Sequence, residues 1–190
     1  MKRVFIVHKW EGAPNSDWYG WLQAQLERKG FEVHVPEMPN SLAPKIDEWV
    51  EYLKEQIGTP EGDTYLVGHS MGCQAILRYL SGISGEARIG GALLVAGFVN
   101  VRKGVFDGLQ SEIIRPWLKT KIDLGRAKKH SKRFVSIFSD NDPYIPLSDS
   151  KTFERELGSK IIIIPKAGHF SEDSGYKELH VALNELLKML

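Results

Sequence analysis

The pentapeptide Gly-His-Ser-Met-Gly at residues 68–72 is the arrangement in this sequence best suited to covalent chemistry. It directly follows an apolar run ending at Val67, and its last two residues begin a helical segment at residues 71–80. A Gly-x-Ser-x-Gly sequence between a strand and a helix is typical of the sharp turn that exposes a nucleophilic serine, a context that a chance pentapeptide in a loop would lack. We therefore predict Ser70 as a nucleophile. The Met71 N–H, at the start of the helix, is then one donor to an oxyanion.

A nucleophilic serine needs a general base and an acid that orients it, and on such a scaffold they follow in the order serine, acid, histidine. Asp140 and Asp142 follow one β-branched run, and His169 follows the next. The carboxyl ends of parallel strands meet at one edge of a sheet, so these side chains are expected to converge there. We predict Asp142 as the acid because it precedes Pro143, where the orienting acid usually stands. Asp140 remains the alternative, and either aspartate could instead only cap its turn.

The other histidines are poorer candidates for the base. His69 is expected to line the nucleophile turn, His130 belongs to a basic run expected at the surface, and His180 is expected to be a surface or packing residue of the last helix. We therefore predict His169 as the general base.

The loop after the first apolar run is expected to supply the second oxyanion donor, the N–H of Trp10. Lys9 stands where glycine is common in such loops, and plain packing is the alternative role for Trp10. Large apolar side chains are candidates for a substrate pocket, with core packing as the competing role. The candidates for substrate binding are Trp18, Trp117 and Phe170, together with Trp21 and Phe98.

Short apolar runs alternate with amphipathic segments along the whole chain. Strands are predicted at residues 4–7, 31–35, 65–67, 92–95, 134–138 and 161–164, and helices at 17–28, 44–56, 71–80 and 176–190. Runs that are apolar throughout suit strands buried on both faces of a parallel sheet. This pattern predicts an α/β fold, a three-layer α/β/α sandwich with about six mostly parallel strands, formed by residues 1–190 as one domain. Residues 97–130 are the least regular and form either a small cap or a loose connection.

The composition excludes several classes of partner. The 190 residues carry a net charge of +1, which gives no electrostatic reason to expect nucleic acid or a membrane as a partner.

The single cysteine, Cys73, cannot form an internal disulfide, and the first ten residues lack a secretory signal, so a cytoplasmic location is expected. No cluster with metal-ligand spacing, Gly-rich dinucleotide turn or Walker sequence is present, so we expect neither a metal nor a cofactor.

With these residues in place, the sequence resembles the small serine hydrolases of the retinoblastoma-binding-protein-nine type, which include bacterial YdeN-like proteins. Beyond the pentapeptide, the similarity includes the segments at 17–22, 36–40, 115–117, 139–146 and 168–170. The resemblance implies a compact α/β-hydrolase core with six parallel strands and no large lid. It also implies that Ser70, Asp142 and His169 correspond to that family's triad. The pocket-protein binding of vertebrate members is not carried over, because no Leu-x-Cys-x-Glu segment is present.

Two functions follow as hypotheses. The first is a serine hydrolase that cleaves a small-molecule acyl substrate, a small carboxylic ester in preference to an amide, through an acyl-enzyme intermediate. The second is a non-catalytic binding or protein-interaction role on the same core, with no protein partner specified, and Lys9 is the one residue that favours it.

Overall fold

Six parallel strands form one open sheet in the computed structural model, which describes residues 1–190. The strands are β1 (Arg3–Val7), β2 (Glu32–His34), β3 (Thr64–His69), β4 (Gly91–Val95), β5 (Phe134–Ser139) and β6 (Lys160–Ile164). They lie in the order β2-β1-β3-β4-β5-β6, and every neighbouring pair is parallel. The chain passes from β1 to β2 on one side of β1, and after β2 it crosses to β3 on the other side. The direction in which strands are added therefore reverses at β1. A ligand site is therefore expected outside the carboxyl ends of β1 and β3.

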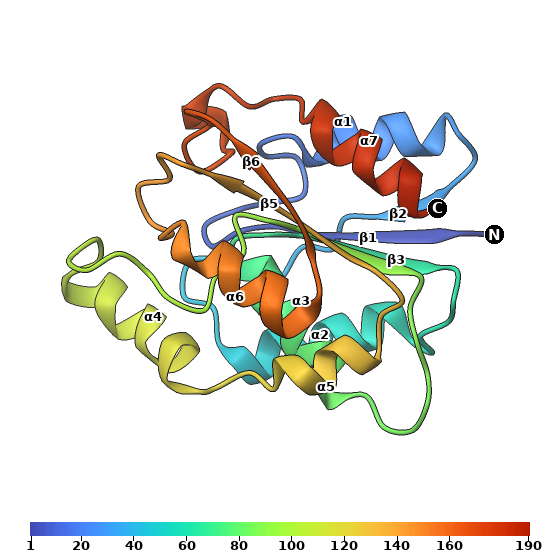
Figure 1. Ribbon diagram of the computed structural model, residues 1–190, viewed down its shortest axis with the longest axis horizontal. Helices are drawn as coiled ribbons and strands as arrows, with labels where there is room; N and C mark the ends of the chain where they lie inside the picture. Colours follow the sequence, from blue (N-terminus) through green and yellow to red (C-terminus); the bar gives the residue numbers. More distant parts are fainter.

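Helices cover both faces of the sheet (Figure 1). On one face lie α1 (Tyr19–Glu27) and α7 (His180–Met189), and on the other α2 (Ile46–Ile57), α3 (Met71–Gly82), α5 (Leu124–Lys129) and α6 (Ser148–Leu157). Each interface between a helix layer and the sheet contains its own hydrophobic core. This arrangement confirms the predicted three-layer sandwich.

The central strands explain why the prediction succeeded. Every residue of β3, β4 and β5 is buried, as continuous apolar runs between two helix layers require. The predicted strand boundaries differ from the observed ones by at most two residues, and several ends coincide. Helix α1 begins two residues later than predicted, because Asp17 has a φ of 51° and lies outside the helical region. Helix α7 begins at His180, after a short 3₁₀ turn at Glu172–Ser174.

Residues 97–130 contain the helix α4 (Gly108–Lys119), which stands beside the carboxyl ends of the strands at the left of Figure 1. The guanidinium of Arg78, on α3, donates to the carbonyls of Trp117 and Thr120 at 2.9 and 2.7 Å. Carbonyls in the last turn of a helix lack helical partners, so this contact caps α4 and attaches it to the core. The segment is a small cap rather than a loose connection.

The base of the cap is attached by a buried carboxylate that sequence reasoning missed. Asp149, in the first turn of α6, accepts hydrogen bonds from the backbone N–H groups of Val99 and Asn100, both at 2.7 Å. Its second oxygen accepts from the Asn100 side chain at 2.9 Å. Helix α6 itself was not predicted, since its few apolar residues are separated by charged ones.

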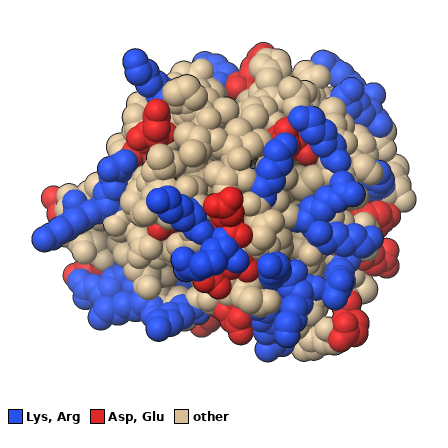
Figure 2. Space-filling view, in the orientation of Figure 1, with Lys and Arg blue, Asp and Glu red and all other residues tan.

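Two further observations concern the surface. On the face that carries α4, α5 and α6, many Lys and Arg side chains lie at the surface with Asp and Glu side chains among them (Figure 2). The expectation that His130 lies at the surface is wrong: it is 5% exposed and bonds through Nδ1 to the carbonyl of Ala87 at 2.8 Å. None of the helices is both long and apolar enough to cross a membrane.

Candidate active site

Ser70 occupies a strained turn between β3 and α3. Its φ of 53° and ψ of −111° are unusual for a residue with a side chain. Two glycines make the turn possible, because a Cβ at Gly68 would lie 2.8 Å from the Cys73 nitrogen and one at Gly72 would lie 2.2 Å from the Val7 carbonyl oxygen. The strain therefore persists because backbone packs directly against both sides of the turn.

His169 contacts a single carboxylate, that of Asp142. The two side chains meet through Nδ1 and Oδ2 at 2.8 Å, in surroundings that leave Asp142 only 2% exposed. The other oxygen, Oδ1, accepts from the backbone N–H groups of Tyr144 and Ile145 at 2.8 and 3.0 Å. Asp140 instead accepts from the Lys166 N–H at 2.7 Å in an exposed turn. Of the two candidate acids, Asp142 is thus the one placed to orient the imidazole.

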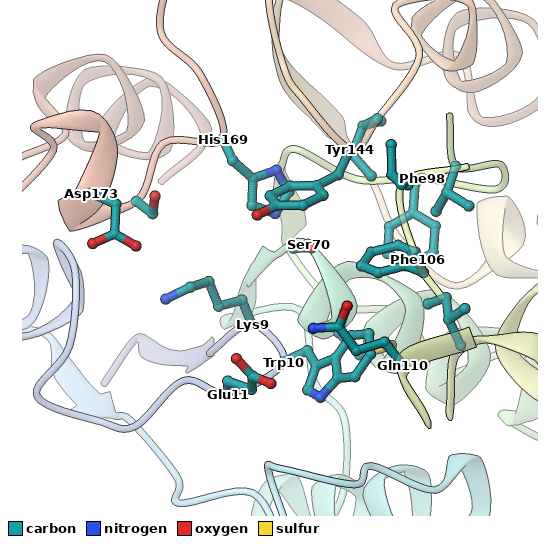
Figure 3. A pocket seen from close by; sticks show the side chains of 16 residues that line it. Lys9, Trp10, Glu11, Ser70, Phe98, Phe106, Gln110, Tyr144, His169 and Asp173 are labelled. Atoms are coloured by element: carbon teal, nitrogen blue, oxygen red, sulfur yellow. The ribbon is translucent and has the colours of Figure 1, made fainter. Parts of the chain in front are cut away.

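Ser70 and His169 line the same cavity (Figure 3). Neither residue is more than 8% exposed, so the cavity is their access to solvent. The structure contains no hydrogen bond between the Ser70 hydroxyl and His169. In hydrolases such a bond often shortens into range only with substrate in place.

The side chain of His8 fixes the backbone of residues 8–12, the loop predicted to supply an oxyanion donor and called the oxyanion loop below. His8 Nε2 accepts from the Met38 N–H at 3.0 Å, so Nδ1 carries the proton and donates to the Lys9 carbonyl at 2.8 Å. The Gly12 N–H also donates to that carbonyl, at 3.0 Å. Burial lowers the pKa of His8, which keeps this tautomer neutral.

The hydrogen bonds to the Lys9 carbonyl fix the orientation of the peptide group between Lys9 and Trp10. Because the peptide is trans, the N–H of Trp10 points away from the Lys9 carbonyl, and it has no hydrogen-bond partner within the protein. The Met71 N–H opens α3 and has no helical partner either. Trp10 and Met71 both line the cavity that contains Ser70.

Lys9 does not close the site. Its ammonium forms an ion pair with Asp17, whose side chain is only 2% exposed. The ammonium is therefore neutralised next to the cavity, although Lys9 still stands where glycine is common in such loops.

The cavity has a volume of about 380 Å³ and two unlike halves (Figure 3). One half lies under the cap and is mostly apolar: Phe98 and Phe106 lie there, together with one polar side chain, Gln110 of α4. The other half carries the charged side chains Lys9, Glu11 and Asp173. The lining also includes the apolar residues Val101, Val105, Ile114 and Ile145 and the polar Ser171. Ser70 lies between the two halves, so a bound molecule would present different chemistry on each side of the serine.

Aromatic rings connect the cap to the histidine. Phe106 lies between Trp10 and Tyr144, with ring centroids 5.5 and 5.7 Å away, and Tyr144 meets His169 edge to face at 5.0 Å. Sequence reasoning missed Phe106 and Tyr144. The position of Tyr144 two residues after Asp142 was the available signal.

The predicted substrate-binding role of Trp18, Trp117 and Phe170 is corrected by their positions, since none of them lines the cavity. All three are at most 1% exposed. Trp18 donates its indole N–H to the Phe170 carbonyl at 3.0 Å, and Trp117 donates to the Pro44 carbonyl at 3.0 Å. Their size favours full burial, so they pack in the two cores instead of facing a cavity. Of the other two candidates, Phe98 lines the cavity, whereas Trp21 packs against His180.

Cys73, one turn beyond the nucleophile, is fully buried, and burial raises the pKa of its thiol. A buried thiol with a raised pKa stays protonated, so it packs as a small apolar side chain.

Comparison with known proteins agrees with this geometry. The model of the family described as serine hydrolase matches residues 4–188. The chain belongs to the serine hydrolase family. It is 29% identical over 185 residues to the hydrolase YdeN of Bacillus subtilis (strain 168), covering 97% of this chain and 94% of that protein. It is 23% identical over 174 residues to the serine hydrolase RBBP9 of Rattus norvegicus, covering 91% and 88%.

Solved structures show the same fold for this serine hydrolase. The crystal structure of the ydeN gene product from B. subtilis has a TM-score of 0.90 at 28% identity and covers 100% of this chain and 98% of its own. Est1E from Butyrivibrio proteoclasticus has a TM-score of 0.69 at 15% identity, covering 99% and 88%, which shows a shared fold alone. The predicted family resemblance and the α/β-hydrolase fold are therefore confirmed.

Proposed function

We propose that this serine hydrolase cleaves small carboxylic esters through Ser70, His169 and Asp142 and an acyl-enzyme intermediate. The observation that carries the proposal is the buried Asp142–His169 pair facing the same cavity as Ser70. A carboxylate on Nδ1 leaves Nε2 as the basic nitrogen, which is the tautomer that a serine nucleophile requires.

In the first step, Nε2 of His169 takes the proton of the Ser70 hydroxyl as Oγ forms a bond to the ester carbonyl carbon. The N–H groups of Trp10 and Met71 stabilise the oxyanion of the tetrahedral intermediate. The intermediate collapses, the ester C–O bond breaks, and His169 gives its proton to the leaving alkoxide. In the second step His169 removes a proton from water, which attacks the acyl-enzyme and releases the carboxylic acid and free Ser70.

The two halves of the cavity support an ester as the substrate class. The apolar half under the cap suits an apolar acyl or alcohol group, and burying each CH₂ there contributes about 0.8 kcal/mol. A volume of about 380 Å³ accommodates a small molecule and not a folded polymer. Esters are favoured over amides because an alkoxide is a better leaving group than an amide nitrogen, which must receive the proton of His169 before it can depart.

The test combines a fluorophosphonate probe with turnover of p-nitrophenyl acetate, butyrate and decanoate. We expect labelling and turnover in the wild type, loss of both in Ser70→Ala and His169→Ala, and faster turnover of the two shorter esters. Ser81→Ala, at the far end of α3, is the matched control and is expected to behave as the wild type. Absence of labelling in folded wild-type protein, or labelling that survives in Ser70→Ala, would contradict the proposal.

A further inference from the structure

The beginning of α1 holds two loops of the active site together. Asp17 accepts a hydrogen bond from the Glu172 N–H at 2.7 Å through one oxygen and pairs with Lys9 through the other. Trp18 donates to the carbonyl of Phe170. The oxyanion loop and the histidine loop, residues 165–175, are thus both attached to one short segment.

Tyr19 extends this attachment through the centre of the site. Its hydroxyl lies 3.2 Å from the Lys9 nitrogen and 2.7 Å from His69 Nδ1. His69 Nε2 in turn lies 2.8 Å from the backbone carbonyl oxygen of His169. A chain of three hydrogen bonds therefore runs from the oxyanion loop, past the residue preceding Ser70, to the backbone of His169.

The direction of every proton in this chain is determined. The carbonyl of His169 can only accept, so Nε2 of His69 carries the hydrogen and Nδ1 is an acceptor. Nδ1 must receive its hydrogen from the hydroxyl of Tyr19, whose oxygen remains free to accept from the Lys9 N–H. No donor faces a donor, and each group is satisfied.

Both side chains are completely buried, so the chain cannot exchange its partners for water. Burial, and next the charge of the neighbouring His169, lower the pKa of His69 from 6.5 to about 3. His69 therefore stays neutral while His169, with its ring centroid 5.3 Å away, gains and loses a proton.

We propose that Tyr19 and His69 are positioning residues for the hydrolytic reaction: their hydrogen-bond chain holds the oxyanion loop, the nucleophile turn and the backbone of His169 in the relative arrangement that the reaction needs. The inference rests on the proposed function, since it assigns these residues a role in the same reaction. It also gives a reason for the buried polar residues His69 and Tyr19, which the triad itself does not use.

The physical basis is the sensitivity of catalysis to small displacements. When side chains that must meet within hydrogen-bond distance are misplaced by about 1 Å, the reaction rate falls about 100-fold. Asp142 fixes the ring of His169 at Nδ1, but only the chain through His69 holds its backbone carbonyl. Trp18 and Asp17 still hold the loop at Phe170 and Glu172, so loss of the chain frees only the backbone of His169 itself to shift relative to Ser70, while the substrate cavity stays intact.

The test measures kcat and KM separately in Tyr19→Phe, His69→Leu and His69→Gln. Tyr19→Phe keeps the ring that packs against Trp18 and removes one hydroxyl. We expect kcat to fall on the order of 10- to 100-fold in Tyr19→Phe and His69→Leu, with KM changed less than about threefold. His69→Gln, whose amide can still donate to the His169 carbonyl, is expected to recover most of kcat. Tyr79→Phe is the matched control, because the Tyr79 hydroxyl is buried without any partner.

The outcomes separate this inference from the proposed function. Wild-type turnover that depends on Ser70, combined with kcat within about twofold of wild type in folded Tyr19→Phe and His69→Leu, overturns the positioning role alone. A wild type without turnover or probe labelling overturns the proposed function and this inference with it. A lowered melting temperature with unchanged kcat indicates a merely structural role and also overturns the inference.

A second measurement examines the chain directly in the wild type. Nitrogen-15 NMR of the histidine side chains is expected to show His69 protonated at Nε2, neutral across the neutral pH range and with a slowly exchanging hydrogen. An Nδ1-protonated His69, or one that titrates near its ordinary pKa, overturns the hydrogen-bond chain whatever the variants do.

Discussion

Replacing Asp142 by asparagine tests the arrangement of the acid and the base most sharply. The oxygen Oδ1 of Asp142 accepts two backbone N–H groups, those of Tyr144 and Ile145, whereas Oδ2 faces His169 at 2.8 Å. An asparagine must keep its carbonyl oxygen toward the two N–H groups, so its amide nitrogen faces His169. That nitrogen can only donate, which forces the proton of His169 onto Nε2. His169 then has no free nitrogen with which to accept the proton of Ser70.

The size of the expected loss in kcat follows from the free-energy cost of turning the asparagine amide to its other orientation. Turning the amide restores the correct tautomer but sets an NH₂ group against two backbone donors at a site that is 2% exposed. Each buried hydrogen bond lost in this way costs about 1–3 kcal/mol, so the pair costs about 4 kcal/mol. At about 1.4 kcal/mol per tenfold change, kcat should fall about 1,000-fold.

The assay is p-nitrophenyl butyrate turnover near neutral pH, with probe labelling as a second measure. Asp140→Asn is the matched control, because that carboxylate bonds to the Lys166 N–H and does not contact His169. We expect kcat of Asp140→Asn within about threefold of wild type. An Asp142→Asn enzyme that retains more than about a tenth of wild-type kcat would refute the reasoning.

Three further predictions concern stability. Gly72→Ala places a methyl group 2.2 Å from the Val7 carbonyl oxygen, so it should lower the free energy of unfolding by about 3 kcal/mol in urea titrations; a loss under about 0.5 kcal/mol would contradict the close approach. The pKa of His69 is lowered on folding, so its stabilising effect is complete above pH 6.5 and declines as the pH falls toward about 3. Unfolding measured across this range should show a flatter slope in His69→Gln than in wild type, and equal slopes would argue against the lowered pKa. Asp149→Ala removes three hydrogen bonds to the base of the cap. It should cost about 3 kcal/mol and speed hydrogen exchange in residues 97–107, whereas unchanged exchange there would show that Asp149 does not hold the cap.

Some features were determined by the amino-acid sequence by itself. They depend on residues that are close together along the chain. The turn at Ser70 needs small residues two positions away on each side, and both are present in the pentapeptide. The buried strands are continuous apolar runs, so their number and their parallel arrangement could be predicted. Ser70, Asp142 and His169 each lie within five residues of the end of such a strand, so their placement at one edge of the sheet could be predicted.

Other features depend on the way distant segments meet, and only the tertiary structure decided them. Asp140 and Asp142 lie two residues apart in one loop, and the path of the backbone alone directs the second toward His169. Trp18 and Phe98 are both large and apolar, yet one packs under α1 and the other lines the cavity.

The hydrogen-bond chain through His69 is the clearest case. It joins residues that are 10, 50 and 100 positions apart, so no local spacing could reveal it. A buried polar group must be satisfied by whatever the fold brings to it, and that partner is known only once the chain has folded.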